Sequence, residues 1–196
     1  IKDSLNSTYE AVEYRRLEYV GPTVSKELIR AGILSILIAI SAMLVYIWFR
    51  FELPFAVGAV IALIHDIILT VGMFSITSLE FNLATVAAIL LIIGYSMNDT
   101  VVVYDRVREN IKKFRKISTI ALLNKSVNET LSRTINTTAT TILALLALFV
   151  FGGNIIQDFS FAMIWGILIG TYSSILIATP VLVFLNVKRS QSKEEQ

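Results

Sequence analysis

The amino-acid sequence predicts an all-α membrane protein with five transmembrane helices. Of its 196 residues, 55% are hydrophobic and only 16% are charged, and the mean hydropathy of +0.71 is too high for an ordinary soluble domain. The apolar residues also gather in five long blocks. Each block is long enough to cross a hydrocarbon core of about 30 Å at about 1.5 Å per helical residue.

The five predicted spans, in order, are residues 33–49, 55–76, 83–104, 134–151 and 159–187. The links after the first, second and fourth are short, so we expect consecutive spans to be antiparallel neighbours. Pro54 suits the first turn of the second span, and Asn82 is a good cap for the third. Residues 126–129 (Ser-Val-Asn-Glu) have the pattern of a capping box for a helix that leads into the fourth span. Pro180 is expected to kink the fifth.

Small side chains recur on one face of three spans, which predicts close helix packing. These residues are Gly166, Gly170, Ser174 and Ala178 on the fifth span, Gly58, Ala62, Asp66 and Thr70 on the second, and Ala84, Ala87, Gly94 and Asn98 on the third.

The distribution of lysine and arginine predicts the orientation in the membrane. The links at residues 77–82 and 152–158 contain neither. Eight lie between the third and fourth spans or at their edges: Arg106, Arg108, Lys112, Lys113, Arg115, Lys116, Lys125 and Arg133. By the positive-inside rule this link and the C-terminus are cytoplasmic, while the N-terminal segment and the two bare links lie outside.

The chain can be divided into three parts. Residues 1–26, which the orientation places outside, look like the end of something larger, so we expect the chain to be a C-terminal part. Residues 27–189 form the membrane domain, and residues 190–196 form a cytoplasmic tail. Within the membrane domain, residues 105–128 alternate basic and apolar side chains at helical spacing. This favours a place at the headgroups of anionic lipids, although a solvated loop fits the first half equally well.

Several kinds of chemistry are excluded or disfavoured by composition. The chain has no cysteine, so disulfides, thiolate metal sites and cysteine nucleophiles are excluded. It has a single histidine, and a histidine-based metal site would need carboxylate partners. We therefore predict no catalytic residue, metal or cofactor.

Asp99 is the most informative residue, because it interrupts an otherwise apolar run. A charge at bilayer depth costs roughly 2.5–3.5 kcal/mol on insertion scales, and such residues mark ion paths by default. Its neighbours Tyr95, Ser96, Asn98 and Thr100 make this a polar cluster.

Arg133 is the predicted partner of Asp99. It stands at the cytoplasmic edge of the antiparallel fourth span, so the two residues should lie at similar depth. The pair is either a structural bridge or a proton site. A nearby guanidinium favours the charged carboxylate, so a change in their separation would change whether Asp99 holds a proton. Asn98, Thr137 and Thr141 are candidates for organising water between them.

Asp66 is a second acid, near the midplane of the second span. It either hydrogen-bonds to a neighbouring helix or serves as a second relay station, whereas the adjacent His65 is interpreted as structural. An intramembrane aspartyl protease is the main alternative function, with Asp66 and Asp99 as its dyad. However, helical rise places Asp99 roughly 7 Å deeper than Asp66, and the Gly-x-Gly that such proteases show before the acid is missing. A passive channel scaffold is the third alternative.

Four segments resemble the SecF family of bacterial protein-export membrane proteins. They are YSMNDTVVVYDRVREN (95–110), LSRTINTT (131–138), ALIHD (62–66) and EYVGPTVSKELIRAG (18–32). The resemblance covers nearly the whole chain and thins over the first dozen residues and the tail. Ser25 stands where the family usually shows glycine, which puts only the local turn in doubt.

The resemblance implies that the chain forms most of one half of a twelve-helix domain of the resistance–nodulation–division (RND) type, the other half being SecD. It also implies a place in the bacterial inner membrane beside the SecYEG channel and its accessory membrane subunits. There, proton-motive force would pull translocating preproteins outward, with no role for nucleic acid. Asp99 and Arg133 match the family's ND and LSRT motifs, both implicated in proton flow. A further acid would come from SecD.

Overall fold

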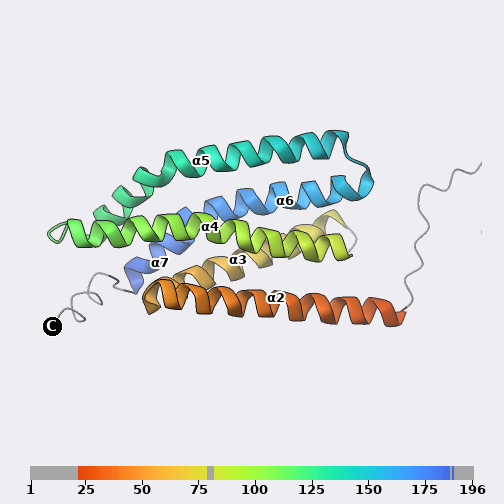
Figure 1. Cartoon of the computed structure of the whole chain (residues 1–196), viewed down its shortest axis with the longest axis horizontal. Coiled ribbons are helices and arrows are strands. Elements are labelled where there is room, and N and C mark those ends of the chain that lie inside the picture. Colours follow the sequence, from red (N-terminus) through yellow and green to blue (C-terminus); the bar gives the residue numbers. More distant parts are fainter. Residues whose placement is uncertain (1–21, 79–81, 186, 188–196) are drawn as a thin grey trace, which may run out of the picture.

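Five long helical stretches run side by side in the computed structural model, which describes residues 22–78, 82–185 and 187 (Figure 1). They are α2 (Pro22–Arg50), α3 (Leu53–Thr77), α4 (Leu83–Lys113), α5 (Thr119–Phe151) and a composite helix of α6 (Asn154–Ser173), η1 (Ser174–Ala178) and α7 (Thr179–Phe184). All five are long and apolar enough to cross a membrane. The described residues include no β-strand. The predicted all-α class and the five spans are confirmed, while residues 1–21 and the tail lie outside the description.

Several predicted helix boundaries are confirmed. Pro54 lies in the first turn of α3, and the Asn82 side chain caps α4 by accepting a bond of 3.1 Å from the Thr85 backbone N–H. Each helix packs against the next along the chain, as the short links require.

The capping box predicted at residues 126–129 is wrong, because α5 begins earlier, at Thr119 with Ser118 as its cap. Ser126 therefore lies inside α5. Its hydroxyl donates to the Leu122 carbonyl at 2.9 Å and accepts from the Asn110 amide at 2.9 Å. The pattern of residue types was that of a cap, but the polar side chains serve contacts between helices.

The segment of residues 105–128 is divided between the end of α4 and the start of α5, which form a hairpin (Figure 1). Polar bonds hold the two extensions together. Glu129 of α5 accepts hydrogen bonds from Arg106 at 2.7 Å and from Asn110 at 2.8 Å, both on α4.

The small-residue face of α6 packs against α4, as predicted. A Cβ built on Gly166 would lie 2.3 Å from the Ile92 side chain, and one on Gly170 would lie 2.8 Å from the Ser96 side chain. These glycines therefore permit an approach that larger residues would block.

The small-residue face of α4 does not pack against the other helices of the described residues, contrary to the prediction. A Cβ on Gly94 would meet nothing within 4 Å, and Ala87 and Asn98 are exposed. The reason is that α4 uses its other side, which carries Ile92 and Ser96, to contact α6.

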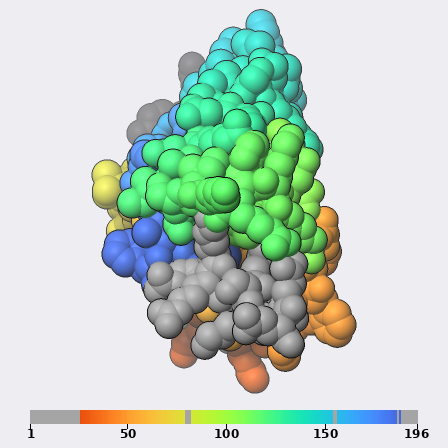
Figure 2. Space-filling model, turned by 90° about the vertical axis from the view of Figure 1, so that its left-hand side faces the viewer, coloured from red at the N-terminus to blue at the C-terminus, as the bar shows by residue number. Residues whose placement is uncertain are grey.

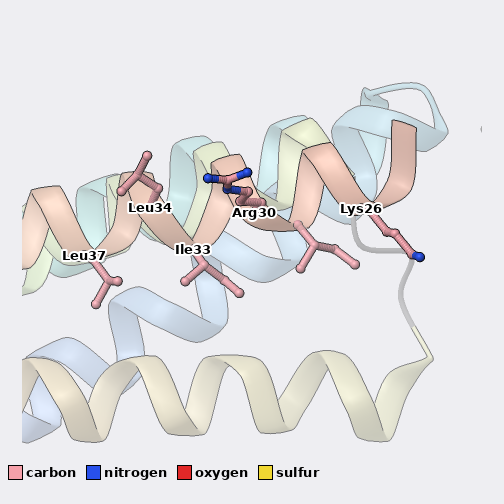
Figure 3. A pocket seen from close by; sticks show the side chains of 6 residues that line it. Lys26, Arg30, Ile33, Leu34 and Leu37 are labelled. Carbon is pink, nitrogen blue, oxygen red and sulfur yellow. The ribbon is translucent and has the colours of Figure 1, made fainter. Parts of the chain in front are cut away.

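The edges of the bundle are largely uncovered. Helices α2 and α5 lie at opposite edges (Figures 1 and 2). Most of the apolar side chains of α2 are exposed. A hollow of about 460 Å³ lies along the N-terminal half of α2 and is lined by this helix alone: Lys26, Ile29, Arg30, Ile33, Leu34 and Leu37. Five of these side chains are labelled in Figure 3. None of the residues that line this hollow is acidic, so it is separate from the polar site inside the bundle.

Candidate functional site

Asp66 is the most completely hydrogen-bonded acid inside the bundle. It lies on α3 and is only 1% exposed. Its Oδ2 atom accepts from the Ser96 hydroxyl of α4 at 2.6 Å and from the Ser173 hydroxyl of α6 at 2.8 Å. Its Oδ1 atom lies 3.1 Å from Nδ1 of His65. Asp66 thus joins three helices. Of the two roles considered for it, the hydrogen bond to a neighbouring helix is confirmed, and the role of relay station stays a prediction.

Asp99 lies one helical turn beyond Ser96 on α4 and is 3% exposed. The Thr171 hydroxyl of α6 donates to its Oδ2 atom over a long distance of 3.4 Å. Thr171 is in turn 2.9 Å from the Thr138 hydroxyl of α5. Asp99 is therefore at the level where α4, α5 and α6 meet, with weaker hydrogen bonding than Asp66.

Further hydroxyl groups lie between the two acids. The Ser174 hydroxyl is 2.8 Å from that of Thr100, and both donate to the Ser96 carbonyl, at 3.3 and 3.2 Å. Residues 171–174, at the end of α6 and the start of η1, consequently contact the surroundings of both carboxylates. We call these four residues, Thr-Tyr-Ser-Ser, the hydroxyl turn.

A π-helical segment begins at the last residue of this turn. It spans Ser174–Ala178 and ends two residues before Pro180, which lacks a backbone N–H. The Thr179 hydroxyl donates to the Ser174 carbonyl at 2.9 Å, and the Tyr104 hydroxyl donates to the Ala178 carbonyl at 3.0 Å. The irregularity that Pro180 predicts thus takes the form of a π-helical turn, a feature that is frequent at functional sites.

Arg133 is exposed and forms no hydrogen bond or ion pair with Asp99 among the described residues. It lies five residues, about 7.5 Å of helical rise, before Thr138, which marks the level of Asp99. The direct ion pair considered from the sequence is therefore not formed, although the charge of Arg133 is near enough to act on Asp99. Their joint role in a relay stays a prediction.

The predicted water-organising residues differ in their surroundings. Thr141 accepts a bond from the Tyr95 hydroxyl at 3.0 Å, and the Thr137 carbonyl accepts from the same hydroxyl at 3.0 Å. Asn98 instead points outward and is exposed. The threonines thus hold α4 against α5, while Asn98 lies on an open face.

Sequence reasoning did not identify Thr171 or Ser173 as contacts of the acids, nor Thr138 as the contact of Thr171. It treated α6 as a small-residue packing face only. The signal that could have found them is the polar run 171–174 within an otherwise apolar span.

The arrangement argues against an aspartyl protease. Asp66 binds Ser96 and Ser173, whereas Asp99 binds Thr171, one turn further along α4. A protease dyad needs two carboxyl groups that share one proton, and these two have separate hydrogen-bond partners. No group of three or more histidine or acidic side chains that could hold a metal occurs in the part of the chain that is described.

Fold and site together define a polytopic α-helical membrane protein with two acids inside its bundle. The chain belongs to the SecD/SecF family of protein export membrane proteins. The model of the C-terminal region of this family matches residues 1–188.

Individual relatives agree with this assignment. The chain is 53% identical over 190 residues to the protein translocase subunit SecF of Rickettsia rickettsii, covering 96% of this chain and 62% of that protein. It is 47% identical over 195 residues to SecF of Cereibacter sphaeroides, covering 100% of this chain and 60% of that one. The chain thus spans about three fifths of these relatives.

A solved structure also matches. The crystal structure of SecDF, a translocon-associated membrane protein from Thermus thermophilus, superposes with a TM-score of 0.81 at 43% identity, covering 85% of this chain and 23% of that one. These likenesses confirm the resemblance seen in the sequence and support a membrane domain of SecDF type.

Proposed function

We propose that the chain is the membrane-embedded part of a SecF-type subunit that works with SecD in proton-driven protein export. The observation that carries the proposal is the position of Asp99. It is a buried acid contacted by the Thr171 hydroxyl, and a charged arginine lies nearby on α5. A buried acid with so few hydrogen bonds is suited to gain and lose a proton.

The mechanism follows from how each protonation state interacts with its surroundings. Charged Asp99 is stabilised by the hydrogen bond from the Thr171 hydroxyl and by the positive charge of Arg133. Proton binding removes that attraction, so α5 and α6 are free to shift relative to α4. In the complete subunit, the outer domain would convert this shift into outward movement of the translocating chain.

The open polar face of α5 supports a partner inside the membrane. Arg133, Asn136 and Thr140 are all exposed on this helix. Exposing an arginine and an amide to lipid is costly, so a protein surface that supplies acceptors is the better neighbour. SecD is the natural candidate, because SecDF structures are among those that match this chain. Asn98 would then face the same interface from α4.

The remaining features of the proposal follow the family. The preproteins, the SecYEG channel with its accessory membrane subunits, and anionic lipids near residues 105–128 are proposed partners. The proposed location is the bacterial inner membrane, with the C-terminus cytoplasmic. Energy would come from the proton gradient without a cofactor, and no peptide bond would be cleaved. The naming of the relatives as translocase subunits is consistent with a protein that is not an enzyme.

The test is Asp99→Asn in the full-length subunit, reconstituted with SecD in vesicles. We expect loss of most proton conductance and of gradient-dependent export, while ATP-driven export continues. The matched control is Asp105→Asn, which alters an exposed acid on the same helix that pairs with Arg50 at 2.8 Å. Full conductance and export in Asp99→Asn would contradict the proposal, and peptide cleavage that either Asp→Ala change abolished would revive the protease alternative.

A further inference from the structure

We propose that Asp66 is a second proton-binding site, which exchanges its proton through His65 and acts on the hydroxyl turn through Ser173. This inference rests on the proposed proton-driven function and extends it from one acid to two.

The first argument is the charge balance around Asp66. The Ser96 and Ser173 hydroxyls donate to its carboxylate, which suits the charged form, and Nδ1 of His65 lies within hydrogen-bond distance of it. Yet no lysine or arginine forms an ion pair with it in the described parts of the chain. A buried carboxylate without a permanent counterion is costly, so a proton or a charged His65 must balance it.

The second argument is that the hydrogen bonds around Asp66 can accommodate a proton. The Ser173 hydroxyl has two acceptors within reach, the Asp66 carboxylate at 2.8 Å and the Gly170 carbonyl at 3.2 Å. When Asp66 holds a proton, Ser173 can turn toward Gly170 and accept a hydrogen bond from the carboxyl group. Both states are then hydrogen-bonded, as a site that changes protonation requires.

The third argument is access. Asp66 is buried, but the side chain of His65 is 27% exposed and touches it directly. The ring of His65 lies 5.8 Å from that of Tyr172 on α6. Imidazole can take a proton at one nitrogen and release one at the other, which allows it to connect the interior with the bundle surface.

The titratable groups that face this site are few. His65 contacts Asp66 from α3 itself, Tyr172 faces His65 from α6, and Asp99 lies one turn away on α4. From α2, η1 and α7, the other elements packed against α3, no ionisable side chain contacts Asp66 among the described residues.

The fourth argument is the link to Asp99. Thr171 contacts Asp99 and Ser173 contacts Asp66, and the two residues lie in the same hydroxyl turn at the start of the π-helical segment. A proton that moves Ser173 from Asp66 toward Gly170 therefore acts on the backbone that also positions Thr171. The two acids are coupled through α6, without any direct contact.

The test is infrared difference spectroscopy of the full-length subunit with SecD while the pH is lowered. Each acid that takes up a proton gives a carboxyl C=O band. We expect Asp66→Asn to remove one band and Asp99→Asn to remove a different one, while the control Asp105→Asn leaves both in place. If Asp66→Asn folds and all carboxyl bands persist, the proposal is wrong, and Asp66 only holds the helices together through hydrogen bonds.

Ser173→Ala keeps the test decisive if Asp66→Asn does not fold. This change leaves the carboxyl group in place but removes one of its hydrogen-bond donors, so the Asp66 band should shift. The control Ser75→Ala, at an exposed position of α3, should shift nothing. No shift in Ser173→Ala would contradict the proposal. The readout does not depend on export, so it separates failure of this inference from failure of the proton-driven function.

Discussion

Asp66 and Asp99 are equally buried but differ in how well their carboxylates are satisfied. Asp66 accepts hydrogen bonds from two hydroxyl groups, at 2.6 and 2.8 Å, and lies 3.1 Å from the His65 ring nitrogen, whereas the Thr171 hydroxyl reaches Asp99 only at 3.4 Å. A charged carboxylate with fewer donors is less stable in a low-dielectric interior. Asp99 therefore gains more stability from a proton or from a partner chain, which supports the proposal that it is the main relay residue.

The acids themselves could be predicted from the sequence, but their partners could not. A carboxylate in an apolar run is conspicuous wherever the chain folds, so Asp99 and Asp66 both stood out. The contacts from Thr171 and Ser173 depend on which side of α6 meets α4 and α3. That is a property of tertiary packing, and a single sequence does not carry it.

Thr171→Val should impair gradient-dependent export at normal protein levels. The change keeps the volume but removes the hydroxyl that contacts Asp99. Hydrogen bonds inside membrane proteins contribute about 0.6–1.7 kcal/mol, which corresponds to a roughly 3- to 20-fold effect. The loss is measured as the rate of protein export in vesicles with an imposed proton gradient.

Thr171→Ser should retain export activity, and Thr140→Val, at an exposed position of α5, is the matched control. Equal export in all three variants would rule out a role for the hydroxyl.

At the scale of elements, the same small-residue pattern occurs on two helices with different outcomes. Gly170 of α6 is in contact with Ser96, whereas Gly94 of α4 meets nothing within 4 Å. Spacing alone predicted packing for both. It could not tell which face meets a helix of this chain and which is left open for a partner outside it.

Gly170→Ala should destabilise the bundle, whereas Gly94→Ala should not. A Cβ on Gly170 would lie 2.8 Å from the Ser96 Cβ and 3.1 Å from its Cα, so α4 and α6 must move apart. Overpacking of this kind costs about 1–3 kcal/mol, more than the roughly 1 kcal/mol that alanine gains over glycine in a helix. Unfolding in detergent measures both variants. A Gly170→Ala protein as stable as Gly94→Ala would contradict the contact.

The π-helical segment offers a second test at this scale. Tyr104 is fully buried, and its hydroxyl supplies a bond to the Ala178 carbonyl beside Pro180. Tyr104→Phe leaves that carbonyl without this donor and should cost about 0.5–1.5 kcal/mol of unfolding free energy. Tyr46→Phe, on the exposed side of α2, should cost nothing measurable. If both changes had the same effect in a detergent unfolding titration, the bond would have no stabilising role.

At the scale of the whole molecule, the links and the helix faces both determine the arrangement, since α6 packs most extensively against α4, to which no link joins it. Short connections make neighbouring spans antiparallel, and the structure confirms that each helix packs against the next. The exposed side chains of α2 and α5 are not covered by the other described helices. Under the proposed function, the SecD partner would meet the exposed polar face of α5.

The predicted orientation can be tested directly, because the chain has no cysteine of its own. Ser78→Cys and Asp158→Cys place single thiols at exposed positions near the two links that lack lysine and arginine, and Lys116→Cys places one in the basic hairpin. A membrane-impermeant maleimide applied to spheroplasts should label Ser78→Cys and Asp158→Cys. It should label Lys116→Cys only after lysis, because positively charged links stay on the cytoplasmic side. Thr138→Cys, inside the bundle, should remain unlabelled. Labelling of Lys116→Cys in intact spheroplasts, with protection of the other two, would invert the orientation and place Arg133 at the outer edge of the membrane.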